Sequence, residues 1–441
     1  NVCFRTERRE AFLSTVAAYT LGCKVNQYDT EGVLSLFSQK GYEIVPFEKK
    51  ADIYIINTCT VTAESDKKSR QIIRRAKDKN PLSIVVVMGC YTQTEPSKVA
   101  QIEGVDIIIG TSGRDLVVEL VEEYRTKKEQ IIKITTADKF EDLPATYHER
   151  TRAYVKIQDG CDNFCSYCKI PYSRGRIRSR LPESILEEVA NLASSGTKEI
   201  IFTGIHIGAY GRDLEGWNLA RILKEALKIP GYRLRLSSIE PLELDDEIIE
   251  LLDYPNFCRH LHIPLQSGTD KILKAMNRKY DTETYSEIIQ KVKDYSPLGL
   301  TTDIIVGFPG ESEEDFIKTC EFVKEMGFTR LHVFPFSRRK GTKAYSLPNQ
   351  IPRKERSRRA KELIAIGQDL EDAYHQKNIG RIAEVVVEQE ALLPETSKRG
   401  FSGTTEDYIK VYIDKPGNGF VQVELEKVYS NGVLGRTLKS V

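Results

Sequence analysis

The sequence predicts an α/β protein with three successive parts: an N-terminal open parallel-sheet domain, a central partial (β/α)6 barrel and a C-terminal small β-barrel. Three observations lead to this prediction. Runs rich in β-forming residues alternate with segments of helical period along two long series. A polar stretch at 135–152 separates those two series and is interpreted as a linker. The end of the chain has only short alternating runs, punctuated by Gly and Pro.

The composition is that of a globular protein and excludes several other classes. Hydrophobic residues make up 40% and charged residues 29% of the 441 residues, which excludes a disordered, collagen-like or coiled-coil chain. No apolar run approaches the ~20 residues of a membrane helix, so we expect no membrane partner. The net charge of +1 excludes a uniformly basic nucleic-acid coat but not a local basic patch. We expect no DNA partner.

The cysteine count bears on the compartment and on the chemistry. Nine cysteines, with no apolar segment among the first residues that could act as a secretory signal, predict a cytoplasmic protein with reduced thiols. An odd number in such a chain favours thiolate chemistry or metal binding over a disulfide framework.

The first domain, 14–134, is predicted from an alternation of strands and helices. This alternation is typical of βαβ units and therefore of a parallel sheet. We expect strands at 14–19, 52–56, 83–87 and 106–109, and helices at 28–40, 64–78 and 112–124.

The second domain, 147–376, carries a longer series of the same kind. Its six strand–helix units could close most of a barrel, in the manner of a partial TIM-type barrel. The domain ends in a highly charged helical stretch at 351–376. We expect strands at 153–157, 199–203, 233–237, 260–263, 301–306 and 330–334, and helices at 183–195, 217–228 and 311–326.

The third domain, 377–441, contains three short alternating runs, at 383–388, 408–413 and 420–425. Runs of this length between Gly and Pro predict a small all-β barrel or sandwich.

The strongest chemical signal is a C-x3-C-x2-C string formed by Cys161, Cys165 and Cys168. It follows the first strand of the predicted barrel, at the end where α/β barrels build their sites. Three thiolates on one loop can hold three corners of a cubane iron–sulfur cluster, which usually has four cysteines. The missing fourth ligand leaves one iron open, as in catalytic metal sites. Zinc binding, a redox dithiol and chance clustering are the alternatives.

A second set, Cys23, Cys59 and Cys90, is scattered in sequence, but each member follows a predicted strand. Because the carboxyl ends of parallel strands share one edge of the sheet, we expect the three thiols to converge there. The set is either a second three-cysteine cluster with an open position or three buried structural cysteines. The remaining cysteines, Cys3, Cys258 and Cys320, are interpreted as ordinary thiols.

The first set resembles the cysteine motif of the radical S-adenosylmethionine (SAM) superfamily. The resemblance implies that the open iron chelates the amino and carboxylate groups of SAM. It also implies that an electron from the cluster cleaves the sulfonium to methionine and a 5′-deoxyadenosyl radical, while the protein positions and shields that radical.

With both sets present, the chain resembles the methylthiotransferases within that superfamily. This resemblance implies two [4Fe-4S] clusters and SAM as cofactors and a C-terminal TRAM domain. We find no D-x-H-x-x-G string, so we expect no cobalamin in the N-terminal domain. The matching strings are TLGCKVNQYDTE at 20–31, NTCTVT at 57–62, GC at 89–90, GCDNFCSYC at 160–168, HIPLQSG at 262–268 and DIIVGFPG at 303–310.

The first of these strings and FSRRKGTKA at 336–344 are similar to the branch that modifies threonylcarbamoyladenosine in tRNA. The resemblance implies methylthio transfer to C2 of N6-threonylcarbamoyladenosine 37, near the anticodon. The cluster of Cys161, Cys165 and Cys168 would generate the radical, and the other cluster would hold or supply the sulfur. The implied partners are the tRNA anticodon loop and a reducing electron donor such as flavodoxin.

Two alternatives stay open at this point. The same chemistry could act on isopentenyladenosine tRNA or on a ribosomal protein side chain. A protein of another class, a non-catalytic iron–sulfur RNA-binding or redox-sensing protein, would also carry such cysteines.

Residues near the expected strand ends are candidate SAM contacts. Gly204 follows the second barrel strand, and the resemblance implies that its loop helps to bind the SAM amino group. Glu240 and Gln266 lie just beyond strand ends and are candidates for ribose or methionine contacts, with surface polar residues as the alternative. His206, His260, His262 and His332 lie near strand ends too, and none is assigned as a ligand.

Basic residues gather in groups that would suit tRNA phosphates or a carboxylate on the modified base. A solvated charged face is the alternative. One group follows the cysteine loop, and the others lie near the end of the second domain. The groups are Lys169, Arg174, Arg176, Arg178 and Arg180; Arg338, Arg339, Lys340 and Lys343; and Arg353, Lys354, Arg356, Arg358 and Arg359.

Overall fold

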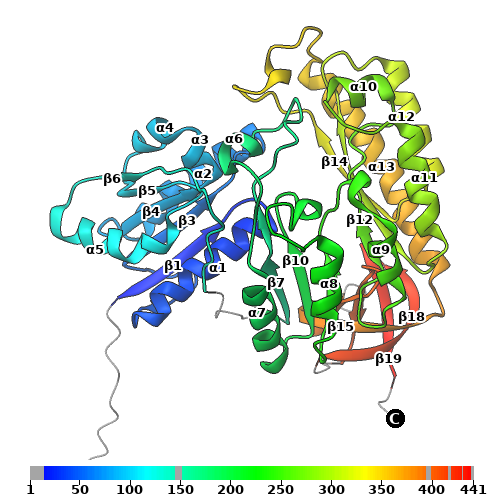
Figure 1. The fold of residues 1–441 in the computed structure, drawn as a ribbon, viewed down its shortest axis with the longest axis horizontal. Helices are drawn as coiled ribbons and strands as arrows, with labels where there is room; N and C mark the ends of the chain where they lie inside the picture. The colour runs from blue at the N-terminus through cyan, green and yellow to red at the C-terminus, as the bar shows by residue number, and fades with distance from the viewer. Residues whose placement is uncertain (1–13, 145–150, 394–398, 416–418, 430, 439–441) are drawn as a thin grey trace, which may run out of the picture. The chain divides into compact units, whose positions relative to one another are not determined.

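The computed structural model describes residues 14–144, 151–393, 399–415, 419–429 and 431–438 (Figure 1). Contacts divide these residues into two compact units. The first unit comprises 14–144 together with Tyr172–Arg174, and the second comprises the rest. Within the described ranges, none of the helices is both long and apolar enough to cross a membrane.

The first unit is built on a parallel six-stranded sheet with the order β2-β1-β3-β4-β5-β6. The four predicted strands are confirmed, and each begins one residue after its expected start. The two outermost strands were not predicted, because each has only two or three residues and no alternation. The strands are β1 Thr15–Thr20, β2 Glu43–Ile44, β3 Ile53–Thr58, β4 Ile84–Gly89, β5 Ile107–Ile109 and β6 Ile131–Lys133.

Helices cover both faces of this sheet, which makes it doubly wound. One core places α1 and α5 against alternate strand residues, and a second core places α2, α3 and α4 against the others. The short α3 and α4 were not predicted. The helices are α1 Lys24–Gln39, α2 Ala63–Lys79, α3 Cys90–Thr94, α4 Pro96–Ala100, the 3-10 turn η1 Arg114–Leu116 and α5 Val117–Lys127.

Part of the stretch interpreted as a linker packs against the first unit. Leu143 is buried in the core beside α1, where a Cβ atom on Gly32 would lie 2.6 Å from the Cβ of Leu143. The Glu141 carboxylate accepts a hydrogen bond from the backbone N–H of Arg114 at 2.6 Å. One leucine in a polar stretch has no periodicity, so the sequence held no signal of this packing.

The second unit contains the expected partial barrel, with its six strands in sequence order. Two three-stranded parallel sheets, β7-β10-β11 and β12-β13-β14, are joined by the bridges Leu234–Phe257 and Ser238–His262. All six predicted strands are confirmed. They are β7 Arg152–Lys156, β10 Glu199–Thr203, β11 Arg233–Leu236, β12 His260–His262, β13 Gly299–Val306 and β14 Arg330–Pro335.

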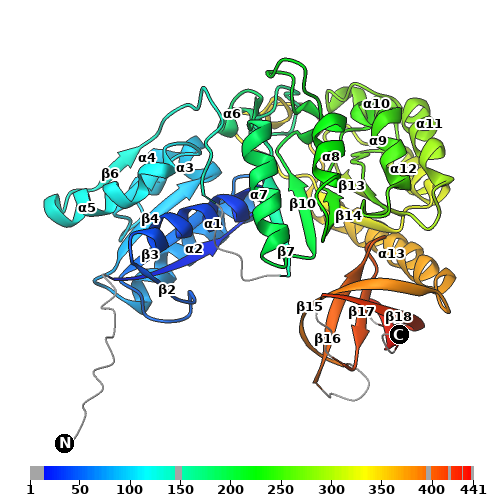
Figure 2. The same cartoon turned by 60° about the horizontal axis from the view of Figure 1, so that its bottom comes forward.

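The helices of this barrel pack beside the strands over one continuous core (Figure 2). A short ribbon of β8 Gln158–Asp159 and β9 Arg178–Ser179 flanks the first cysteine loop. These helices are α7 Pro182–Ser194, α8 Leu219–Leu227, α9 Asp246–Ile249, α10 Asp270–Ala275, α11 Thr282–Lys293 and α12 Glu313–Met326, with the 3-10 turns η2 Ile207–Ala209, η3 Pro241–Glu243, η4 Glu250–Asp253 and η5 Lys343–Tyr345. The short helix α6 Ile170–Arg174 precedes them, and its last three residues belong to the first unit.

The C-terminal residues form a closed five-stranded barrel after the long helix α13, Arg353–Lys377. This result decides between the two architectures that the sequence left open. Strands β16 and β19 were not predicted, because their Gly-containing sequences lack alternation. The strands are β15 Ile382–Leu392, β16 Arg399–Thr405, β17 Lys410–Ile413, β18 Phe420–Tyr429 and β19 Gly432–Thr437.

A buried ion cluster joins this small barrel to the larger one within the second unit. Glu199 on β10 is fully buried and pairs with Arg152, Arg233 and Arg235. Burial alone would raise the pKa of Glu199, but the three guanidinium groups hold it well below its usual range. Arg233 donates to the carbonyl of Thr404 at 2.7 Å, so the same arginines fasten β16.

Candidate functional site

The first cysteine loop begins at Gly160, directly after β8. The φ of Gly160 is +80°, and a Cβ atom there would lie 1.7 Å from the carbonyl oxygen of Arg176. Glycine is therefore required at this position, because the chain after β8 passes close to the backbone of Arg176, just before β9. The backbone N–H of Asn163 then donates to Cys161 Sγ at 3.5 Å, and that of Ile170 donates to Cys168 Sγ at 3.4 Å. The loop thus turns backbone donors toward its sulfur atoms.

The three thiols of this loop lie close enough to influence one another. Burial raises the pKa of Cys168 to about 12, and the nearby Cys165 and Cys161 add to that rise. Burial also raises the pKa of Cys165, with the Arg278 guanidinium opposing the rise and Cys161 adding to it. The loop therefore gathers three sulfur donors whose ionisation a bound metal would favour.

The metal-ligand candidates on this loop are its three cysteines. Across the described ranges, no group of three or more His, Cys, Asp or Glu side chains is placed to hold one metal ion. Iron–sulfur clusters are held by cysteine thiolates. The cysteine-only donor set is the one that such clusters use.

Apolar residues and backbone hydrogen bonds hold this loop from outside. Tyr167 packs on the cluster of Ile272, Met276, Phe308, Phe336 and Ala344. Ser166 N–H donates to the carbonyl of Met276 at 2.9 Å, and Ala344 N–H donates to the carbonyl of Ser166 at 2.7 Å. The end of α10 and the string at 336–344 therefore fix the cysteine loop.

Gly204 lies beside the start of the cysteine loop. A Cβ atom there would lie 3.0 Å from Gln158 Oε1, which also accepts the backbone N–H of His206 at 2.7 Å. Gln158 Nε2 in turn donates to the carbonyl of Gly160 at 2.7 Å. One buried amide thus ties the loop after β10 to the loop of Cys161.

His206, which sequence analysis left unassigned, contacts a predicted ligand. Its Nδ1 is 3.7 Å from Cys161 Sγ, and its Nε2 is 2.7 Å from Glu243. Burial alone would lower the pKa of His206, but the hydrogen bonds to Cys161 and Glu243 raise it to about 10. Its only signal in the sequence was its place two residues after Gly204.

A cavity of about 200 Å³ opens beside Cys165. Glu240 lines it and pairs with Arg278, whose Nη1 donates to Cys165 Sγ at 3.3 Å. Arg278 was not predicted, because it lies 113 positions from that cysteine and no sequence motif connects the two. The described lining is Asn163, Cys165, Arg212, Glu240, Leu242, Glu243, Asn277, Arg278, Lys279 and Tyr280.

Gln266 is outside the described lining of that cavity. Its backbone joins β13: its N–H donates to the carbonyl of Asp303 at 2.8 Å, and its carbonyl accepts from Ile305 at 2.9 Å. Its φ of +71° is in the left-handed region, which is uncommon for a residue with a side chain. Such a conformation is frequent at functional sites.

The second cysteine set gathers in the first unit at the carboxyl ends of its strands. Cys23 caps α1, Cys59 follows β3, and Cys90 begins α3 after β4. The φ of Gly22 is +107°, and a Cβ atom there would lie 3.1 Å from Cys59 Sγ. Absence of a side chain at Gly22 therefore permits the loop of Cys23 to approach Cys59.

These three thiols also influence one another. Burial raises the pKa of Cys59 to about 12, and Cys90 and Cys23 add to that rise. Burial of the Cys23 thiol by the surrounding protein raises its pKa; the Arg174 guanidinium opposes this rise, and Cys90 adds to it. Part of the Cys23 residue is open to solvent. Each set is thus a group of three sulfur donors in mutual electrostatic contact.

A buried polar network supports the second set from within the first unit. Asn26 Nδ2 donates to the carbonyls of Leu21 and Thr58, at 2.7 and 3.1 Å, and so joins the loop of Cys23 to the loop of Cys59. Its Oδ1 accepts from Arg174 at 2.5 Å. Arg174 also donates to Asp29 at 3.0 Å, and Asp29 pairs with Arg114.

The prediction that the basic residues after the first cysteine loop face tRNA is wrong for four of the five. Lys169, Arg174, Arg178 and Arg180 are buried, and only Arg176 is exposed. The arginines have carboxylate partners: Asp29 for Arg174, Asp159 for Arg178 and Glu188 for Arg180. Burial and these pairs keep the three arginines from forming the exposed basic surface that the linear run suggests.

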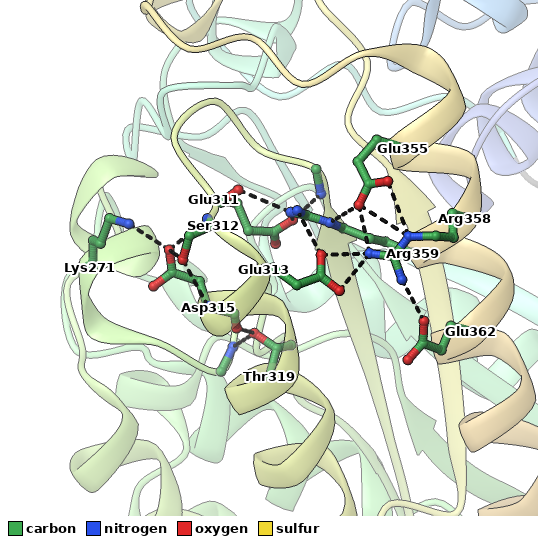
Figure 3. Close-up of polar contacts among 12 residues, drawn as sticks. Lys271, Glu311, Ser312, Glu313, Asp315, Thr319, Glu355, Arg358, Arg359 and Glu362 are labelled. Carbon is green, nitrogen blue, oxygen red and sulfur yellow. Dashed lines mark hydrogen bonds and ion pairs between the residues drawn. The ribbon is translucent and has the colours of Figure 1, made fainter.

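Two of the five basic residues on α13, Arg358 and Arg359, pair with carboxylates (Figure 3). Arg359 is buried and pairs with Glu311 at 2.6 Å, while Glu311 accepts the backbone N–H of Gly307 at 2.6 Å. The pair therefore shapes the loop after β13. Arg358 is half exposed and pairs with Glu313, Glu355 and Glu362.

In the group after β14, Arg338, Lys340 and Lys343 are exposed, and Arg339 is buried.

Of the other cysteines, Cys258 and Cys320 are buried, and Cys3 lies outside the described residues. Cys258 Sγ lies 3.9 Å from Glu199, within the ion cluster that joins the two barrels.

Comparison with known proteins is consistent with the division into a parallel-sheet unit and a barrel unit. Residues 155–323 match the radical SAM superfamily, and residues 15–110 match an uncharacterized protein family, UPF0004. The threonylcarbamoyladenosine tRNA methylthiotransferase MtaB of Bacillus subtilis (strain 168) is 44% identical over 408 residues, 90% of each chain. MtaB of Thermotoga maritima is 35% identical over 96% of each chain. A tRNA-2-methylthio-N(6)-dimethylallyladenosine synthase of Caldicellulosiruptor saccharolyticus is 36% identical over 84% of this chain and 81% of that protein.

Solved structures share the fold. The radical SAM methyltransferase TsrM from Kitasatospora setae has a TM-score of 0.56 at 14% identity, covering 75% of this chain and 76% of that one. The cobalamin-dependent radical SAM enzyme OxsB has a TM-score of 0.52 at 13% identity, covering 80% and 56%. At these identities the likeness concerns the fold alone. The sequence relatives carry the assignment: this chain belongs to the methylthiotransferase family of the radical SAM superfamily.

Proposed function

We propose that the protein is a tRNA methylthiotransferase that adds a methylthio group at C2 of N6-threonylcarbamoyladenosine 37. The observation that carries this proposal is the 44% identity, across 90% of both chains, to a relative named for that activity. A relative named for the dimethylallyladenosine reaction is less similar, at 36%.

In this proposal Cys161, Cys165 and Cys168 would hold one [4Fe-4S] cluster beside the SAM site. When bound, the cluster supplies the electron that cleaves SAM and so starts the radical chemistry. The residues of the chain bind and shield it. Backbone N–H groups of Asn163 and Ile170 stabilise thiolate charge, and the apolar cluster behind Tyr167 excludes water.

SAM itself is bound by the surroundings of this loop. Gly204 lets the turn after β10 pack against Gln158 beside the cysteine loop, and in this proposal that turn helps to bind the amino group. Glu240, on the cavity beside Cys165, and Gln266, four residues after β12, contact its ribose or methionine part. An unactivated aromatic C–H offers no polar handle, which is why acid–base groups alone would not suffice for the reaction.

Cys23, Cys59 and Cys90 hold the second [4Fe-4S] cluster, which bears or supplies the transferred sulfur. Cys23 is the exposed member of the set, so this edge of the sheet is open to an incoming group. A second molecule of SAM provides the methyl group.

The partners follow from the substrate. The anticodon loop of tRNA presents its bases unpaired, so the target adenosine can be splayed into the site. The exposed Arg338, Lys340 and Lys343 bind its phosphates or the carboxylate of the modified base. A low-potential donor such as flavodoxin reduces the clusters, and the reaction takes place in the cytoplasm.

Mass spectrometry of tRNA nucleosides from cells with and without the gene tests the proposal. Deletion should remove the methylthio form of threonylcarbamoyladenosine and accumulate its precursor. The wild-type gene should restore the product, and a matched gene with Cys161→Ala should not. An unchanged nucleoside would reject the substrate, and loss of another methylthio nucleoside would identify the correct one.

A further inference from the structure

We infer that Arg278 is a positioning residue that raises the reduction potential of the cluster held by Cys161, Cys165 and Cys168, through its hydrogen bond to the Cys165 sulfur. The inference rests on the proposed function, because it requires that cluster. It concerns a residue that contacts a ligand but does not itself bind iron.

Arg278 is fixed from three sides. Its Nη1 donates to Cys165 Sγ at 3.3 Å, and its Nε donates to Tyr280 Oη at 3.0 Å. Its Nη2 pairs with Glu240, and its Cζ lies 5.0 Å from the centre of the Tyr280 ring. Only 4% of the side chain is exposed. A guanidinium held in this way is a preorganised donor to sulfur.

The turn that carries Arg278 is fastened to the cysteine loop. Arg278 N–H donates to the carbonyl of Leu273 at 2.9 Å, which closes the turn after α10. Asn277 has a φ of +63° and donates from Nδ2 to the carbonyls of Asn163 and Phe164, at 3.2 and 3.1 Å. With the bond from Ser166 to Met276, three contacts set the distance between this arginine and its cysteine.

The electrostatic consequence has a definite sign. Reduction adds one electron to the cluster from an external one-electron donor and changes no bond or proton in the protein. Hydrogen bonds to cluster sulfurs and nearby net charge are among the factors that set the potential of iron–sulfur clusters. A buried cation stabilises the more negative reduced state, so Arg278 raises the potential. Glu240, with the opposite charge at the same cavity, lowers it.

The test isolates this cluster and titrates it. In a Cys23→Ala/Cys59→Ala/Cys90→Ala background, only the second unit can hold the cluster. After anaerobic reconstitution, iron and sulfide content report whether the cluster forms, and a dithionite titration followed by electron paramagnetic resonance gives its potential. SAM is omitted, so contacts of Arg278 or Glu240 with SAM play no part.

Arg278→Gln should lower the reduced-to-oxidised ratio at the parent midpoint by about tenfold, equal to about 59 mV for one electron. Arg278→Lys keeps the charge and should shift the ratio less. Glu240→Gln should shift it in the opposite direction. Lys279→Gln is the matched control, since this exposed neighbour lines the same cavity and should leave the potential unchanged.

The failures are distinguishable. If the background binds no iron, the proposed cluster assignment is wrong. If Arg278→Gln binds a full cluster with an unshifted potential, the inference is wrong. If Arg278→Gln binds no cluster, Glu240→Gln decides: a raised potential supports the inference, and an unshifted potential overturns it.

Discussion

The two cysteine sets show two ways to bring three thiols together. Cys161, Cys165 and Cys168 lie on one loop, after one strand of the partial barrel. Cys23, Cys59 and Cys90 come from the ends of three strands and meet only when the parallel sheet forms. The first arrangement depends on local loop geometry, whereas the second depends on the register of a whole domain. A change in the first unit can therefore disable one set and spare the other.

The largest expected effect separates the two sets by function. Cys161→Ala should abolish SAM cleavage, because two cysteines would not hold the cluster that the cleavage requires. Cys59→Ala should preserve cleavage and stop sulfur insertion. Chromatography of 5′-deoxyadenosine and mass spectrometry of the tRNA product measure the two steps. Cys320→Ala, a buried thiol on α12, is the control and should support both. Loss of cleavage in both cysteine variants would contradict the division of labour.

The next test weakens only the fold-dependent set. Arg174→Met removes a buried partner of Asp29 and Asn26, and should lower the free energy of unfolding by about 3 kcal/mol. Iron content should fall toward that of one cluster, with SAM cleavage retained. Denaturant unfolding and iron analysis check this. Arg176 is exposed, so Arg176→Met should change neither the free energy of unfolding nor the iron content. Equal effects of the two variants would refute the role of the network.

A smaller effect is expected at the close approach between the loops of Cys23 and Cys59. Gly22→Ala places a Cβ atom 2.9 Å from the Cβ of Cys59 and adds strain at positive φ, costing about 2 kcal/mol. Gly113→Ala shares the strain, with a φ of +78°, but meets no atom closer than 3.6 Å. Iron content after reconstitution should fall only for Gly22→Ala. Similar losses in both variants would assign the effect to strain alone.

The smallest expected effect concerns tRNA and should leave both sets intact. Arg338→Gln/Lys340→Gln/Lys343→Gln should weaken tRNA binding, and the slope of log K against log salt should become shallower by about 1 for each phosphate that is no longer neutralised. Binding titrations between low and physiological salt measure that slope. Arg358→Gln, whose charge is already paired with three carboxylates, should change it little. An equal change in both variants would argue against a specific basic surface.

The comparison also explains what the sequence could and could not predict. Alternating β-rich and helical runs located the four main strands of the first unit's sheet and the six strands of the partial barrel, because burial on both faces gives most of them a clear apolar signal. The short β2 and β6 and the Gly-containing β16 and β19 lack that signal. Leu143 falls in the stretch interpreted as a linker, because one buried residue has no period.

Long-range charge partners account for most of what was missed at the site. The run of basic residues after Cys168 is visible in sequence, but Asp29, the partner of Arg174, lies 145 positions away. Arg278 lies 113 positions from Cys165, with no local motif to connect them. A single sequence displays charges without their partners, so it favours a surface interpretation where the folded chain has a buried pair.

The inclusion of Tyr172–Arg174 in the first unit makes that unit a discontinuous domain. A gene divided between the two main segments would yield an N-terminal fragment without Arg174, leaving Asn26 and Asp29 short of a partner inside it. Such a cut would therefore remove part of the network that supports Cys23, Cys59 and Cys90. Because Glu149–Pro171 belongs to the second unit, no single cut separates the two units, and splitting experiments should keep residues 14–144 and Tyr172–Arg174 on one chain.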